Sequence, residues 1–437
     1  MRKISEFIEK KVAPMAGRMS RNKYIQALQN TFLALVPFFT LGSFALVITS
    51  PPMDYTTMEP GFLCSLFEGW AKVAEFTGPV LNPVFMITMP LMALYVSVGI
   101  GFFLAKHHKM PTVLPVLMTV GSFFITAGLD VDGNFISNYF DATGLFTALI
   151  VSVFAFEFYR YLVEKKFGHI NLDGIGVPPA LADSLGNLVP VVTVFVSVAL
   201  INHLLVMIIG NPLPVLITLL MTPLVTMVDN VWGIIFLAVI VMLFWWFGIH
   251  DSVITSALDP FFYNNLGVNA AAFAAGTAAV ALPHIVTSPF WWHFMTIGGS
   301  GATFGLAILA VTSKSKQIRT IGKLGIIPSF FNINEPLIFG LPLMYNPVMM
   351  IPFVFVMPLN GLITYLAMNF GLVSKTFAYA GWNVWSPIAA LIDTLDFRAV
   401  ILVFILIAID ILVYLPFFKV FEKQKLEEEK TEVNTES

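Results

Sequence analysis

The sequence has little charge for its length. Only 11% of its 437 residues are Asp, Glu, Lys or Arg, whereas 57% are hydrophobic. A soluble chain of this size needs a far more charged surface, and an outer-membrane β-barrel alternates polar and apolar residues. Because the apolar residues here form long continuous runs, the sequence predicts an all-α polytopic membrane protein that resides in a lipid bilayer.

Cysteine is also nearly absent. Cys64 is the only one, which excludes an intrachain disulfide and a Cys-based metal cluster. The seven histidines show no His-x-x-x-His spacing, which would place two ligands on one helix face. The sequence therefore predicts no metal site and no cofactor, and it indicates no nucleic-acid partner. A cleavable signal peptide is not evident either.

The few Lys and Arg residues are unevenly placed. They gather near the N-terminus, at 106–109, at 160–166 and at 314–323, which the positive-inside rule assigns to the cytoplasm. Acidic connectors, including the one over 50–78 that holds Cys64, are expected outside. No Lys or Arg lies between Lys166 and Lys314, so charge leaves the topology of 210–314 open.

The apolar runs predict about ten transmembrane helices, with both termini in the cytoplasm, plus re-entrant hairpins in the C-terminal half. The clearest expected spans are 27–49, 80–105, 112–128, 144–162, 188–209, 232–247, 347–370 and 400–418.

Four parts are expected along the chain. Residues 1–25 predict an amphipathic helix on the cytoplasmic surface, and 26–186 an N-terminal transmembrane part. Residues 187–418 predict a C-terminal substrate-binding part, with re-entrant segments near 248–269 and 325–345. Residues 419–437 predict a charged cytoplasmic tail without a fold of its own.

The most informative stretch is FNINEP, residues 331–336. An ionised side chain at the bilayer centre costs roughly 3 kcal/mol or more. Pro336 lacks an N–H and is expected to push Glu335 out of the helical region, so the backbone should break here. A break inside a membrane is tolerated where it faces protein or a watery cavity. Asn332, Asn334 and Glu335 are therefore expected to face a central site; the alternative is a short solvent-facing loop.

Two further stretches could carry chemistry. GIHDS places His250 and Asp251 directly after an apolar run, which predicts the tip of a re-entrant hairpin; the alternative is an extracellular loop. Trp382 could stack on a sugar ring, although a membrane-belt or core position is the alternative, and His293 is interpreted as an interface residue of an aromatic belt. A site of Glu, Asn, His and Trp side chains, without a buried Lys or Arg, suits a neutral, hydroxyl-rich ligand.

Three motifs in order carry a resemblance. FNINEP, GIHDS (248–252) and GGSGAT (298–303) resemble the lactose/cellobiose family of phosphotransferase-system (PTS) sugar permeases, in particular the membrane component IIC of the cellobiose/diacetylchitobiose type. GGSGAT is not a nucleotide-binding loop, since no Lys-Ser/Thr follows it. Asp251 departs from the pattern, because many relatives have Gly after the His.

The resemblance implies a homodimer in the bacterial cytoplasmic membrane, with dimer contacts made by the N-terminal part. It implies that the C-terminal part binds a disaccharide whose C6 hydroxyl is phosphorylated by a phosphocysteine on a separate IIB protein, with IIA upstream. The chain would then be the membrane part of a phosphotransferase complex and not an enzyme alone.

Residue by residue, the resemblance implies that Glu335 hydrogen-bonds the C6 hydroxyl and acts as its base. His250 would lie beside the same hydroxyl, Asn332 and Asn334 would shape the loop or bind sugar, and Trp382 would be a stacking platform.

Two other classes of function stay open. One is an ion-coupled disaccharide symporter that binds its ion through Glu335 and Asp251 or Asp259, and the other is a non-transporting scaffold or sensor.

Overall fold

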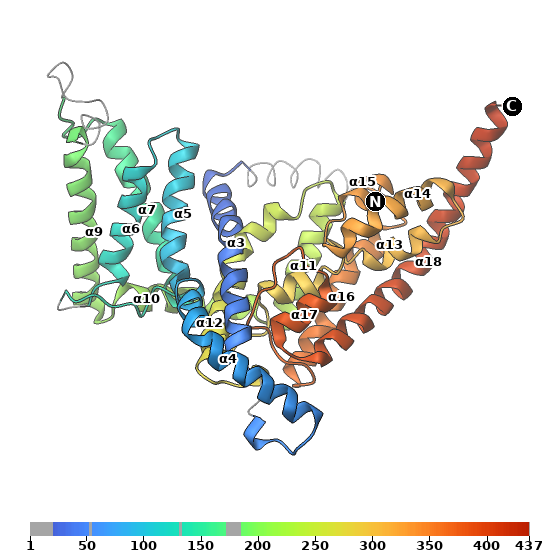
Figure 1. Ribbon diagram of the computed structural model, residues 1–437. Coiled ribbons are helices and arrows are strands. Elements are labelled where there is room, and N and C mark those ends of the chain that lie inside the picture. The colour runs from blue at the N-terminus through green and yellow to red at the C-terminus, as the bar shows by residue number, and fades with distance from the viewer. Residues whose placement is uncertain (1–20, 52–54, 131–132, 172–184, 437) are drawn as a thin grey trace. The chain divides into compact units, whose positions relative to one another are not determined.

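The computed structural model describes residues 21–51, 55–130, 133–171 and 185–436. Most of the surface helix expected over 1–25, and most of the connector after 168, lie outside these residues. Within them the chain is helical apart from turns, extended connections and one isolated bridge between Leu129 and Phe135 (Figure 1). The predicted all-α class is therefore confirmed.

Six helices of the described part are long and apolar enough to cross a membrane, or up to seven if a bent helix pair counts as one span. Ten spans thus stay a prediction. The described residues group into two compact units. One contains the residues up to Val36 and Met86–Val225, and the other contains Pro37–Phe85 and the residues from Thr226 onward.

The first unit is a helix bundle built on close packing. Its helices are the start of α3 (Lys23–Thr49), α5 (Met92–His107), α6 (Val113–Ala127), α7 (Leu145–Glu164), α9 (Leu188–Ile209) and most of α10 (Leu213–Val228). Figure 1 shows α5, α6, α7 and α9 side by side, in agreement with their contacts. Gly101 lets α6 approach α5, because a Cβ there would lie 2.4 Å from the Thr119 hydroxyl.

Between α3 and α5 the structure differs from the predicted topology. Instead of one helix over 80–105, α4 (Phe62–Met86) ends before a 3₁₀ turn, η3 (Met89–Leu91), and α5 starts at Met92. Pro90 has no N–H to bond back to Met86, so it cannot extend α4. The connector predicted over 50–78 is helical from Phe62 onward, and Cys64 lies within α4, where its Sγ contacts the Tyr55 carbonyl oxygen at 3.6 Å.

The second unit holds all the candidate site residues. Its later helices are α11 (Val231–Trp246), α12 (Ser252–Ala274), α13 (Phe304–Val311), α14 (Lys316–Phe330), α15 (Glu335–Gly340), α16 (Met350–Asn369), α17 (Ser386–Thr394) and α18 (Phe397–Glu436). A short π-helix, η6 (Phe290–Met295), and extended connections complete it. Its core contains large side chains from α11, η6, α16 and α18 that are fully buried.

The polar stretch expected as an interruption over 248–269 is mostly a helix, α12. Its buried amides explain the difference, because internal partners satisfy them. The Asn265 amide donates to the Val286 carbonyl at 2.8 Å, and the Asn269 amide donates to the carbonyls of His284 and Thr376, each at 2.8 Å. Polar residues that the sequence predicted as part of a re-entrant segment therefore hydrogen-bond α12 to the extended segments beside it.

The tail expected to be without structure is helical, because α18 continues to Glu436. Glu422 accepts hydrogen bonds from Ser313 Oγ and the Lys314 N–H, both at 2.6 Å. Glu429 accepts hydrogen bonds from the Ser315 hydroxyl at 2.7 Å and from the Gln317 N–H at 3.0 Å. The acidic residues of the tail thus bind the free N–H groups at the start of α14, which stabilises both helix ends.

Candidate functional site

A glycine-rich loop, residues 297–303, lies at the centre of the second unit. Three of its glycines have positive φ, and at Gly299 φ is 102°. A Cβ on Gly299 would lie 2.4 Å from the Asn334 side-chain amide carbon, so another residue would both strain the backbone and collide with FNINEP. The loop can therefore approach FNINEP only because it has no side chain at this position.

Two buried asparagines of FNINEP hold this loop. The Asn334 amide donates to the Ser300 carbonyl and to the Thr303 hydroxyl oxygen, both at 2.7 Å. The Asn332 side-chain oxygen accepts a hydrogen bond from the Gly298 N–H at 2.9 Å. The Asn332 side-chain NH₂ donates to the Trp382 backbone carbonyl at 2.8 Å. Asn332 also has a φ of 58°, which Asn tolerates better than most residues. The two amides thus join three segments that lie far apart in the sequence.

Glu335 has the opposite character, since its side chain is exposed. The helix breaks between Phe330 and Glu335, as predicted, but Glu335 itself is the first residue of α15 and not a residue outside the helical region. Pro336 is tolerated there because the N–H groups of a first helical turn have no partner to lose. The carboxylate is therefore presented by a short, rigid helix start.

The GIHDS stretch precedes α12. The His250 side chain is 50% exposed, whereas that of Asp251 is 8% exposed. The His250 Nδ1 atom lies 2.9 Å from Asp251 Oδ1, and the imidazole lies against Trp245 with ring centroids 4.6 Å apart. The other Asp251 oxygen accepts a hydrogen bond from the Ser300 hydroxyl. Asp251 thus links His250 to the glycine-rich loop, and the Glu335 carboxylate is near enough for its charge to act on the His250 ring.

Trp382 is partly exposed, and so is Trp292, whose ring centroid lies 6.4 Å from that of Trp382. The backbone before Trp382 is held by a pair that the sequence did not reveal. His293 Nδ1 lies 2.5 Å from Asp393 Oδ2, and His293 Nε2 lies 3.0 Å from the Gly381 carbonyl oxygen. Asp393 also accepts from the Ala380 N–H at 2.9 Å.

The aromatic-belt interpretation of His293 is therefore wrong. Its side chain and that of Asp393 are both 0% exposed, which an interface residue would not be. The two residues are 100 positions apart, and no local pattern indicates such a pairing. Ser300 was missed for the same reason, because its contact with Asp251 spans 49 positions.

The structure thus brings His250, Asp251, Asn332, Asn334 and Glu335 together around one loop, with Trp382 attached through Asn332. Exposed acid and imidazole groups sit on a frame of buried amides. In the part of the chain that the structure describes, no group of three or more His, Cys, Asp or Glu residues could hold a metal ion. The arrangement suits hydrogen bonding to a polar, uncharged ligand and proton transfer at one of its hydroxyls.

The sequence pattern of the family described as "Phosphotransferase system, EIIC" matches residues 29–356. The chain belongs to this family. EIIC is an integral membrane component, and the resemblance to the lactose/cellobiose group is confirmed. The lichenan permease IIC component of Bacillus subtilis is 30% identical, over 98% of this chain and 96% of that protein.

Two further similarities agree with this assignment. The cellobiose-specific EIIC component of Geobacillus stearothermophilus is 29% identical over 99% of this chain and 97% of that one. The crystal structure of the transporter ChbC, the IIC component from an N,N'-diacetylchitobiose-specific PTS, has a TM-score of 0.86 with 28% identity, covering 97% of this EIIC chain and 99% of that chain. The likeness therefore includes both the bundle and the site-bearing unit.

The glycine-rich loop of this EIIC provides a first prediction. Gly299→Ala is expected to lower sugar affinity at least tenfold, because the new methyl group would displace Asn334. Gly276→Ala is a matched control, since Gly276 has a φ of 92° but open space around its Cβ. The control should lose about 1–2 kcal/mol of stability from backbone strain and keep its affinity. Equilibrium sugar binding and thermal unfolding are measured for both variants. Equal sugar affinities in Gly299→Ala and Gly276→Ala would contradict the role of the loop.

Proposed function

We propose that this EIIC carries a β-linked disaccharide, cellobiose or N,N'-diacetylchitobiose, across the bacterial cytoplasmic membrane and presents its C6 hydroxyl to a phosphorylated IIB protein. The observation that carries the proposal is an exposed Glu335 carboxylate and a half-exposed His250 on two segments that both contact the glycine-rich loop, through Asn334 and through Asp251. The names of the cellobiose, lichenan and diacetylchitobiose relatives support β-linked glucose-type sugars as the ligand class.

The site has the parts that the chemistry needs. Glu335 accepts the C6 hydroxyl hydrogen bond and takes its proton, while His250 hydrogen-bonds the same oxygen. The sugar oxygen then forms a bond to phosphorus, the phosphorus–sulfur bond to the IIB cysteine breaks, and the thiolate leaves with the electron pair. Trp382 stacks its ring face on the sugar. Asp251 orients His250 and also contacts the ligand itself. Positioning of the hydroxyl, and not metal or cofactor binding, is this chain's contribution.

The phosphoryl donor is a separate chain in this proposal. Cys64, the one cysteine, lies in α4 with its sulfur against the Tyr55 carbonyl, which does not suit a phosphocysteine that must meet the sugar. A IIB protein, recharged by IIA, therefore acts in trans.

The subunit in this proposal has about ten spans with both termini in the cytoplasm. It pairs as a homodimer through its N-terminal part, 26–186, and binds sugar in its C-terminal part, 187–418, with re-entrant elements near 248–269 and 325–345.

Uptake by whole cells tests the class of transport. Uptake of labelled cellobiose is expected to persist when a protonophore collapses the proton gradient and to stop when the IIB gene is removed. A symporter would show the reverse, because its driving force is the ion gradient and not a phosphoryl donor. Uptake that stops with the protonophore and ignores the loss of IIB would replace the phosphotransferase role of Glu335 by ion binding.

A further inference from the structure

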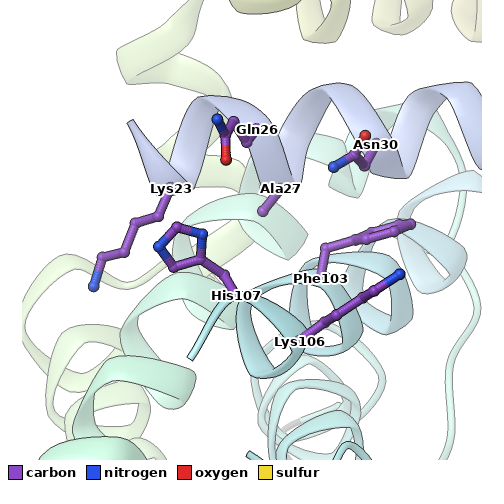
Figure 2. Close-up of a pocket in the computed structure, with 7 residues that line it drawn as sticks. All are labelled: Lys23, Gln26, Ala27, Asn30, Phe103, Lys106 and His107. Atoms are coloured by element: carbon purple, nitrogen blue, oxygen red, sulfur yellow. The ribbon is translucent and has the colours of Figure 1, made fainter. Parts of the chain in front are cut away.

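A cavity of about 250 Å³ lies between α3 and α5, within the bundle unit (Figure 2). Its lining comes from the first two turns of α3 and the last turns of α5. The lining residues are Lys23, Gln26, Ala27, Asn30, Phe103, Lys106 and His107. Figure 2 shows the Lys106 side chain beside the Phe103 ring, which lies between Lys106 and Asn30 in this view. No carboxylate lines this space, so its polar groups are bases and amides.

The basic groups of the cavity are not all engaged elsewhere. The Lys23 ammonium is committed, because it donates to Glu157 at 2.6 Å and lies 3.1 Å from His108 Nε2. Lys106 and His107 are exposed, and within the described residues the Lys106 side chain makes no hydrogen bond or ion pair. The Lys106 ammonium, the His107 imidazole and the Asn30 amide around one cavity form a site for an anion with several oxygen atoms.

An apolar strip continues from the cavity along α5. Phe102 and Val98 lie one and two turns before Lys106 on α5, and they are 39% and 38% exposed. Residues three and four apart share a helix face, so these side chains extend the lining of the cavity. A free anion would not contact such a strip, whereas the acyl chain of a lipid would pack against it.

The basic cavity and the apolar strip follow each other as the headgroup and the acyl chain of a lipid do. Lys106, His107 and Lys109 are at the end of the bundle that the positive-inside rule assigns to the cytoplasm, so the strip runs from there into the membrane. We propose that the cavity binds the phosphate headgroup of an anionic glycerophospholipid, with an acyl chain along Phe102 and Val98. Basic pockets between transmembrane helices on the cytoplasmic side have the chemistry for such headgroups. The inference is independent of the sugar site.

Lipid binding to the purified, full-length protein tests the proposal. Native mass spectrometry would compare phosphatidylglycerol with the zwitterionic phosphatidylcholine, and glycerol phosphate would serve as the headgroup without acyl chains. Wild type is expected to retain phosphatidylglycerol in preference to phosphatidylcholine. Lys106→Gln should weaken phosphatidylglycerol about fivefold, and Lys106→Gln with His107→Gln should weaken it further. Glycerol phosphate should displace the lipid poorly, because it lacks the contact with the strip.

Lys109→Gln is the matched control. It removes the same charge three residues away, from an exposed side chain that does not line the cavity. Its lipid binding should equal that of wild type, and all variants should elute as wild type does in size exclusion. Equal losses in Lys106→Gln and Lys109→Gln would overturn the proposal in favour of general surface charge. Equal retention of the two lipids, or glycerol phosphate that competes as well as the lipid, would also overturn it.

Discussion

Glu335→Gln is expected to lower the rate of IIB-dependent sugar phosphorylation by about 10²–10⁴-fold, the usual contribution of a general base. Gln keeps the size and one acceptor oxygen of Glu, but it cannot take the proton of the C6 hydroxyl. Because Glu335 is exposed at the start of α15, its substitution should leave the frame of Asn332 and Asn334 unchanged. The loss should therefore appear in activity and not in stability.

Initial rates with purified phosphorylated IIB and the protein in liposomes measure this effect. Glu75→Gln, on the exposed face of α4, is the matched control and should keep the wild-type rate. Thermal unfolding of all three proteins should agree within a few degrees. A Glu335→Gln protein that phosphorylates cellobiose within threefold of the wild-type rate would contradict the assignment of Glu335 as the base.

Asp393→Ala should give the largest loss of stability. Its carboxylate and the His293 imidazole are 0% exposed and 2.5 Å apart, and removing one member of a buried pair costs about 3–5 kcal/mol. The substitution also leaves the Ala380 N–H without its acceptor. Since His293 contacts the Gly381 carbonyl just before Trp382, sugar affinity should fall together with the unfolding temperature.

Asp393→Asn provides the graded comparison, because it keeps an oxygen for the Ala380 N–H and removes only the charge. It should lose less stability than Asp393→Ala, as measured by thermal unfolding in one detergent. If Ala and Asn at 393 were both as stable as wild type, the pair would not hold the Trp382 segment in place.

The sequence alone singled out the candidate site residues, but not the distant partners that hold them in place. Glu335 and His250 stood out because a charge or an imidazole is costly inside an apolar chain, and this argument needs only local sequence. The structure places both beside the glycine-rich loop that the sequence also singled out. The buried partners, Asp393 and Ser300, could not be found in this way, since each acts on a residue at least 49 positions away.

Two polar stretches that the sequence did not predict as helices are helical for a common reason. The polar stretch from 248 to 269 was interpreted as an interruption, yet Asn265 and Asn269 are satisfied by distant carbonyls and lie within α12. The tail after 419 was expected to be unstructured, yet Glu422 and Glu429 bind the start of α14. In each case polarity was taken as a sign of irregular backbone, whereas tertiary hydrogen bonds satisfied the polar groups within a helix.

The most direct test of the central claim is equilibrium binding of radiolabelled disaccharides to the purified protein, without IIB and with or without sodium. Cellobiose or N,N'-diacetylchitobiose should bind in both conditions, maltose should not, and His250→Ala together with Glu335→Gln should abolish binding. Binding that requires sodium or low pH would contradict the account and favour an ion-coupled carrier. Binding of the β-linked sugar that is unchanged in the double variant would show that the sugar site lies elsewhere.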